Sequence, residues 1–128
     1  MRPTRPEEMA GDTPARSAGD PGRNRDVWLV VPCFNEGTVI EDVLRHARET
    51  FPNIVAVDDG SVDDSAMAIH RAGAHLVRHP VNLGQGAAIQ TGVEYARAQP
   101  GARYFVTFDA DGQHQIKGVL TMVGRLRS

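Results

Sequence analysis

The sequence predicts an α/β domain, built on a mostly parallel sheet with helices on both faces. Short apolar runs rich in β-branched residues recur along the chain, as in strands that are buried on both sides. Segments with apolar residues at helical spacing separate these runs, and the connections between them are short. Strands that alternate with helices over short connections form parallel sheets covered by helices.

The chain begins with a segment that cannot form a core. Residues 1–25 have almost no large apolar side chains, and they contain three glycines and the prolines Pro3, Pro6, Pro14 and Pro21. Such a composition cannot bury enough surface to offset the entropy lost on ordering. We therefore expect a disordered leader at 1–25 and one domain at 26–128.

The first elements of this domain follow directly. The run "VWLVV" (27–31) predicts a buried strand. A helix should follow it and end at Pro52, because apolar residues recur at helical spacing from Val39 to Ala47. The run "IVAV" (54–57) predicts the second strand.

The second half repeats the pattern. A helix is expected at 65–72, with Asp63 or Asp64 as its N-cap and Gly73 as its stop. The remaining expected elements are a weaker strand at 74–77, a helix at about 87–98, a strand at 104–108 and a helix at about 116–126.

Composition excludes several classes of protein. The net charge of −2 gives no basic excess for nucleic acid, and no apolar run approaches the roughly 20 residues of a transmembrane helix. No apolar signal-peptide segment is present at the N-terminus. The single cysteine, Cys33, excludes an internal disulfide and fits a reducing compartment. We therefore expect a cytoplasmic protein.

Polar and acidic loops follow all four predicted strands. They read "PCFNE" (32–36), "DDGSVDD" (58–64), "HPVNLGQG" (79–86) and "DADGQH" (109–114). In a doubly wound sheet, ligands bind outside the carboxyl ends of the strands. Taken singly, these residues are explained as turns and helix caps. Their occurrence at the same edge of one sheet favours a binding site.

The chemistry of these loops fits a nucleoside diphosphate. Asp109 and Asp111 can face one cavity, and a Mg or Mn ion between them and a pyrophosphate would neutralise both sides. Asp58 or Asp59 could accept hydrogen bonds from a base, and Glu36 from a base or ribose.

Four motifs carry a resemblance to a known family. "VVPCFNE", "VDDGSVDDS", "NLGQGAAIQTG" and "FDADGQH" resemble, in this order, the motifs of the inverting family 2 glycosyltransferases of the GT-A fold. The chain is most similar to polyprenyl-phosphate and dolichol-phosphate sugar transferases, over residues 27 to about 120. The resemblance implies a Rossmann-like fold and metal-assisted transfer of a sugar from a UDP- or GDP-sugar to an acceptor, a polyprenyl phosphate. Full-length relatives are often membrane-associated, so the resemblance also allows a place at the cytoplasmic face of a membrane.

The resemblance also implies roles for individual residues. Asp109 and Asp111 would be the catalytic and metal-binding carboxylates, Ala110 would lie against ribose and pyrophosphate, and Gln113 would neighbour the metal. The base and ribose pocket would be formed by Pro32, Phe34, Glu36, Val57, Asp58 and Asp59. Phe34 replaces the commoner tyrosine, and Gln85 stands where lysine or arginine is frequent.

The chain ends at Ser128, one predicted helix after the metal motif. Family members continue with an acceptor half, so we expect this chain to be the nucleotide-binding half only, truncated at its C-terminus. The alternative to a working transferase is therefore a catalytically empty, nucleotide-binding remnant. A phosphatase of the haloacid dehalogenase type is disfavoured, because its similar D-x-D-G motif ends the first strand and is followed by threonine or valine rather than Gln113.

Two further features receive structural interpretations. His75 and His79 lie in a strand-to-loop region. We expect that they do not share a face and that neither has a role in the site. Gly84 and Gly86 begin a G-x-G, but Ile89 stands where a dinucleotide-binding fingerprint needs glycine. We attribute these glycines to close backbone approach or tight helix packing.

Overall fold

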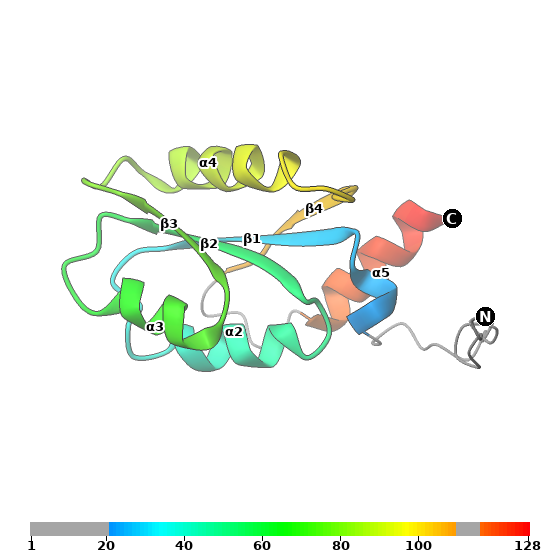
Figure 1. Cartoon of the computed structure of the whole chain (residues 1–128), viewed down its shortest axis with the longest axis horizontal. Helices are drawn as coiled ribbons and strands as arrows, with labels where there is room; N and C mark the ends of the chain where they lie inside the picture. The colour runs from blue at the N-terminus through cyan, green and yellow to red at the C-terminus, as the bar shows by residue number, and fades with distance from the viewer. Residues whose placement is uncertain (1–20, 110–115) are drawn as a thin grey trace, which may run out of the picture.

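The computed structural model describes residues 21–109 and 116–128, which form a four-stranded parallel sheet between two layers of helices (Figure 1). The strands are β1 (Val27–Cys33), β2 (Asn53–Asp59), β3 (His75–His79) and β4 (Tyr104–Thr107), in the order β3-β2-β1-β4. All three neighbouring pairs are parallel. The predicted α/β class is therefore confirmed.

Strand β1 lies inside the sheet and pairs on both sides. It contacts β2 from Trp28, opposite Asn53, to Cys33, opposite Asp58. On its other side Val27 to Val30 pair with β4, and one further hydrogen bond joins the Phe108 N–H to the Val30 carbonyl at 3.0 Å. A strand with neighbours on both edges and helices on both faces must be apolar throughout, which explains the run from Val27 to Val31.

The helices are divided between the two faces of the sheet (Figure 1). One face packs against α2 (Ile40–Arg48), α3 (Ser65–Ala72) and α5 (Ile116–Arg127), whose buried residues share one core cluster with Leu29, Val31 and Ile54. The other face packs against α4 (Gln85–Arg97), over a smaller cluster that contains Val30, Val55 and Val57. The alternation of side chains along each strand supplies both clusters.

Helix α4 approaches the sheet closely at Gly92. A Cβ atom added at this position would lie 2.4 Å from Cγ1 of Val30 and 3.2 Å from Cγ2 of Val57. Only glycine leaves room for these two side chains, so Gly92 sets the distance between α4 and the sheet.

Helix α3 begins after Asp64 and ends at Gly73, as predicted. Gly73 adopts a left-handed conformation, with φ of 82°, and its N–H donates to the His70 carbonyl. Asp64 occupies the N-cap position without a side-chain hydrogen bond to the helix, whereas Asp63 accepts from the Ser65 N–H at 2.9 Å.

The described part of the domain begins earlier than expected. Residues 21–25 were assigned to the leader, but Pro21–Asn24 form the 3₁₀ helix η2. Asn24 is only 1% exposed, and its side chain donates to the Thr50 carbonyl at 3.1 Å. The rest of the predicted leader lies outside the described residues and stays a prediction.

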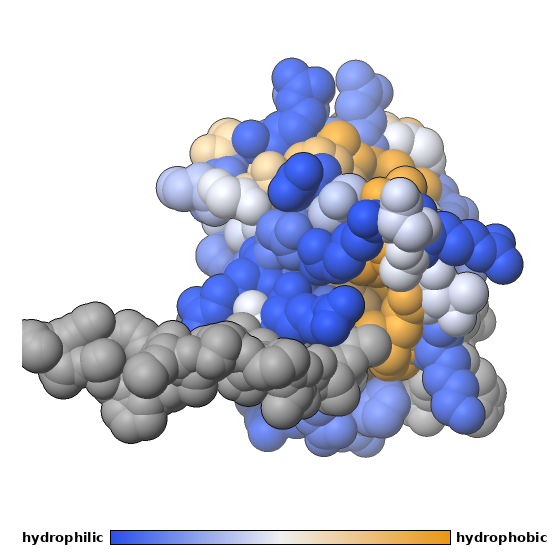
Figure 2. Space-filling model, turned by 90° about the vertical axis from the view of Figure 1, so that its right-hand side faces the viewer, coloured by the Kyte–Doolittle hydropathy of each residue, from blue (hydrophilic) through white to orange (hydrophobic). Residues whose placement is uncertain are grey.

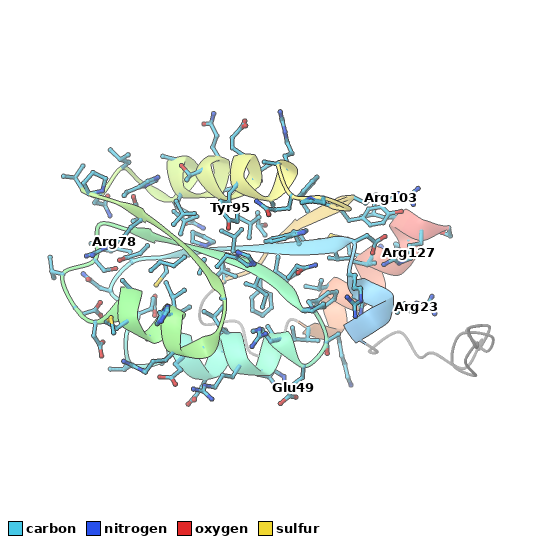
Figure 3. The ribbon with its side chains drawn as sticks, in the orientation of Figure 1. Arg23, Glu49, Arg78, Tyr95, Arg103 and Arg127 are labelled. Carbon is cyan, nitrogen blue, oxygen red and sulfur yellow. The ribbon has the colours of Figure 1, made fainter. Side chains whose placement is uncertain are left out.

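An ion pair closes the end of the sheet where the strands begin. The Arg127 guanidinium donates to both carboxylate oxygens of Asp26, at 2.9 and 2.7 Å, and lies 5.2 Å from the ring centroid of Tyr104. Arg127 is seen at this end together with Arg23 and Arg103 (Figure 3). The surface of this end is largely polar, with an apolar strip on one side (Figure 2). In residues 21–109 and 116–128, no helix is long and apolar enough to cross a membrane.

Candidate functional site

The strand order creates a crevice at the carboxyl end of the sheet. The chain moves outward from β1 through β2 to β3, then crosses back and places β4 on the other side of β1. Such a reversal of strand order is where open α/β sheets bind ligands. A cavity of about 520 Å³ lies there, between the ends of β1 and β4 and the start of α4.

This cavity is lined by residues from four loops or loop ends. They are Pro32, Cys33, Phe34, Glu36, Asp59, Asn82, Gly84, Gln85, Ala88 and Asp109. Five of them belong to the site predicted from sequence, namely Pro32, Phe34, Glu36, Asp59 and Asp109. Segments far apart in the chain meet here because all the strands run parallel and end at the same edge.

Phe34 and Asp109 are open to solvent at this cavity. The Phe34 side chain is 46% exposed, although it is large and apolar. Asp109 is exposed directly after Phe108, whose backbone still bonds to β1. An exposed ring and an exposed carboxylate at the carboxyl ends of two neighbouring strands can contact an aromatic base and a cation, respectively.

Two of the predicted binding residues do not line the cavity. Val57 is fully buried under α4, so its side chain belongs to the core. Asp58 is also fully buried, and its side chain lies on the opposite face of the sheet from Asp59 because strand residues alternate. Its carboxylate accepts from the Ser61 N–H at 3.1 Å and from Nε of Arg78 at 3.2 Å.

Asp59 is held by three donors. Oδ1 accepts from the Leu83 N–H at 2.8 Å and lies 2.8 Å from Nδ1 of His79, while Oδ2 accepts from the Gly84 N–H at 2.9 Å. Burial acts to raise the pKa of Asp59, but the hydrogen bonds from His79, Leu83 and Gly84 outweigh it and hold the pKa below its ordinary value. The carboxylate is therefore ionised at neutral pH and fixes the loop before α4.

The structure corrects the expectation for the two histidines of β3. The strand extends to His79, beyond the predicted end at Val77, so His75 and His79 share the face that α4 covers. Nδ1 of His75 lies 2.8 Å from the hydroxyl of Tyr95, and Nε2 of His79 lies 2.8 Å from Oγ1 of Thr91. Period-two alternation, continued through His79, is the signal that could have revealed this.

The glycines at the start of α4, Gly84 before the helix and Gly86 as its second residue, are also explained differently than expected. A Cβ atom added at Gly84 or Gly86 would meet nothing within 4 Å, so close packing does not require them. Gly84 has φ of 101° and ψ of 158°, a backbone conformation for which glycine is needed. This turn brings the first residue of α4, Gln85, to the cavity, together with the partial positive charge of a helix N-terminus.

The predicted metal ligands are only partly within the described residues. Asp109 lines the cavity, whereas Ala110, Asp111 and Gln113 lie outside the described part of the chain. Among residues 21–109 and 116–128, no group of three His, Cys, Asp or Glu side chains could hold a metal ion. The metal site therefore stays a prediction that rests on the D-A-D segment.

Cys33 lies in the wall of the cavity but is only 2% exposed. Burial raises the pKa of its thiol to about 11. A protonated, buried thiol is a packing group.

Known proteins resemble this chain in sequence. A dodecaprenyl-phosphate galacturonate synthase of Rhizobium johnstonii is 35% identical over 126 residues, covering 88% of this chain and 36% of the relative. A UDP-N-acetylglucosamine–dolichyl-phosphate N-acetylglucosaminyltransferase of Methanococcus voltae is 31% identical, covering 69% and 42%. The chain thus spans well under half the length of these curated relatives.

Solved structures share the fold. Glucosyl-3-phosphoglycerate synthase from Mycobacterium tuberculosis, in complex with Mn²⁺, UDP and glucosyl-3-phosphoglycerate, superposes with a TM-score of 0.57 at 24% identity. The match covers 84% of this chain and 39% of that one, and the predicted GT-A type of fold is confirmed. A family model described as "Glycosyl transferase family 2" matches residues 28–128. The chain therefore belongs to glycosyl transferase family 2.

Proposed function

We propose that this chain binds a nucleotide-diphospho-sugar in the cavity between β1, β4 and α4, as the donor-binding part of a glycosyltransferase that acts on a polyprenyl phosphate. The observation that carries this proposal is the convergence of Pro32, Phe34, Glu36, Asp59 and Asp109 on one cavity. Each was expected at the site from the sequence, and their loops come from three different strands.

The cavity suits a nucleotide donor in size and in polarity. Its volume of about 520 Å³ lies within the range of small-molecule sites, roughly 300–1,000 Å³. The half-exposed ring of Phe34 offers a stacking surface for a base, and the Glu36 carboxylate offers an acceptor for a base or ribose. The N-terminus of α4 favours the negative charge of a diphosphate. The M. tuberculosis synthase of the same fold was crystallised with UDP.

Asp109, Asp111 and Gln113 fit a divalent cation such as Mg²⁺ or Mn²⁺ by the chemistry of their oxygen donors. When bound, the ion would stabilise the negative charge of the departing diphosphate as a Lewis acid. The chain's own residues hold the donor: Phe34 and Glu36 at the nucleoside, and α4 at the diphosphate.

The reaction that follows is a single displacement. An oxygen of the acceptor phosphate attacks the anomeric carbon as the bond from that carbon to the donor diphosphate breaks, so the configuration inverts. A phosphate oxygen is already ionised at neutral pH, and the attack therefore needs no general base. The second candidate function is binding of the nucleotide without turnover, which the same cavity would also permit.

Titration calorimetry with UDP and GDP, with and without Mn²⁺, tests the binding. We expect Asp111→Asn to abolish the gain in affinity that Mn²⁺ gives, because the ion loses one of two carboxylates. The matched control is Asp42→Asn, which removes an exposed carboxylate from α2, away from the cavity. Unchanged metal dependence in Asp111→Asn would refute the metal assignment.

A transfer assay then separates the two candidate functions. A UDP- or GDP-sugar labelled in the sugar is incubated with the protein and a polyprenyl phosphate, and the label is followed into the lipid phase. Transfer supports the glycosyltransferase, whereas nucleotide binding without transfer supports the second candidate.

A further inference from the structure

His79 is the central member of a polar chain that links β3, β2 and α4. Its Nδ1 lies 2.8 Å from Oδ1 of Asp59, and its Nε2 lies 2.8 Å from Oγ1 of Thr91. His79 is 9% exposed and Asp59 is 2% exposed. The hydrogen bond between His79 and Asp59 is therefore shielded from water, and losing it would leave a buried polar group without a partner.

The direction of these hydrogen bonds follows from the charge of Asp59. An ionised carboxylate only accepts, so Nδ1 of His79 must carry a proton and donate to Asp59. In the neutral ring, Nε2 then accepts from the hydroxyl of Thr91. This arrangement fixes the imidazole from both sides and aims it at Oδ1.

Asp59 in turn holds the loop that shapes the cavity. Its two oxygens accept from the Leu83 and Gly84 N–H groups, and its backbone carbonyl accepts from the Asn82 side chain at 3.3 Å. The segment 82–84 is thereby wrapped around Asp59, directly before the N-terminus of α4. Because both Asp59 oxygens are already engaged, its carboxylate is better suited to holding this loop than to binding a base.

We propose that His79 is a positioning residue of the donor site, which fixes Asp59 and, through it, the backbone of Leu83 and Gly84, so that the N-terminus of α4 faces the diphosphate of the donor. This inference rests on the proposed function for the identity of the ligand. It assigns a role to His79 and Thr91, and it changes the role of Asp59 from a nucleoside ligand to a support of the diphosphate end.

Two conservative substitutions separate the contacts of His79. His79→Asn keeps an amide N–H close to the position of Nδ1, so it can still donate to Asp59. His79→Gln places its amide near the position of Nε2, so it can reach Thr91 but not Asp59. Thr91→Val removes only the hydroxyl that holds the ring.

The measurements are the affinities for UDP with Mn²⁺ and for uridine, and the hydrogen-exchange rates of the Leu83 and Gly84 amides in the ligand-free protein. We expect His79→Gln to lower UDP affinity by about tenfold or more, with less than about twofold effect on uridine, and to speed exchange at both amides about tenfold. His79→Asn should restore both quantities to within about threefold of the wild type. Thr91→Val should shift both in the direction of His79→Gln, by a smaller factor.

A general loss of stability would lower UDP and uridine affinity by the same factor, and that result would overturn the positioning role. Unchanged exchange of Leu83 and Gly84 in His79→Gln would also overturn it. If the wild type binds neither UDP nor GDP, the proposed function fails, and the exchange rates of the two histidine variants alone decide whether His79 holds this loop. If His79→Gln does not fold, Thr91→Val supplies the same comparison.

Discussion

Replacing Asp58 with asparagine tests whether this buried carboxylate can accept a hydrogen bond from a nucleotide base. Asp58 is covered by Arg78, which is 58% exposed in its side chain and lies at the carboxyl end of the sheet (Figure 3). Because the Arg78 side chain is exposed, it can move away and leave the Asp58 carboxylate to a base, which would then take its place as the hydrogen-bond donor. By this route Asp58 could contact a nucleoside although it does not line the cavity.

The size of the effect follows from the two hydrogen bonds of Asp58. Asparagine keeps an acceptor for the Ser61 N–H, but its amide NH2 would face the Nε–H of Arg78, so that hydrogen bond is lost and the free energy of unfolding should fall by about 1–3 kcal/mol. Each kcal/mol corresponds to about 4–8 °C in melting temperature for a domain of this size. A base N–H that loses a charged acceptor should cost about 1.5–3 kcal/mol, or roughly 10- to 150-fold in nucleoside affinity.

Nucleoside affinity, measured by calorimetry with uridine and guanosine with and without Mn²⁺, is the assay. We expect the loss in Asp58→Asn to be the same whether or not the metal is present. Arg78→Gln is the matched control, since it breaks the same ion pair and leaves the acceptor in place. Equal losses in Asp58→Asn and Arg78→Gln would show that Asp58 only holds its loop, and a loss confined to the presence of Mn²⁺ would place it at the phosphates.

Two further predictions concern stability. Gly92→Ala should lower the free energy of unfolding by about 1–2 kcal/mol in urea denaturation, because the new methyl group overlaps Val30. The control is Gly124→Ala in α5, where a new Cβ meets nothing within 4 Å, and it should raise the free energy of unfolding by up to about 1 kcal/mol. A change of the same sign in both variants would contradict the packing at Gly92. Since hydrogen bonds hold the pKa of Asp59 below its ordinary value of 3.8, its contribution to stability should be complete above about pH 4 and lost as the pH falls through the lower, folded pKa. The melting temperature of Asp59→Asn should therefore be lower than that of the wild type at pH 6 and should fall less between pH 5 and 3; parallel pH profiles would refute the assignment.

The fold could be predicted from the sequence where local pattern and tertiary environment agree. The run from Val27 to Val31 is apolar throughout because β1 is buried on both faces, and Gly73 ends α3 because it alone tolerates a left-handed φ. The end of β3 was missed because the buried residue of this edge strand is His79, so a histidine stands where an apolar signal was sought. The leader boundary was missed because Asn24, a polar residue, is buried through a contact with distant Thr50.

The candidate site was predictable in its residues but less so in their roles. Pro32, Phe34, Glu36, Asp59 and Asp109 could be proposed because each follows a strand predicted from the sequence, and parallel strands end at one edge. The different roles of Asp58 and Asp59 could not be predicted. They depend on the face of the sheet on which each side chain lies and on partners 20 residues away, Arg78 and His79. The local sequence "VDDGS" contains no pattern that predicts those contacts.

Strand order, which no single segment encodes, is what turns these loops into a cavity. Had β4 paired beside β3, Asp109 would lie at the far edge of the sheet from Phe34. Pairing of β4 with β1, continued by the hydrogen bond from the Phe108 N–H to the Val30 carbonyl, instead sets Asp109 next to the end of β1. The crossover that makes this possible carries α4 over β2 and β1, and Gly92 lets the helix lie close enough to bring Gly84 and Gln85 to the same crevice. Residues from four loops therefore form one site only because α4 packs closely on the sheet. For this reason we expect substitutions at Gly92 or His79 to alter the site, although neither residue lines the cavity.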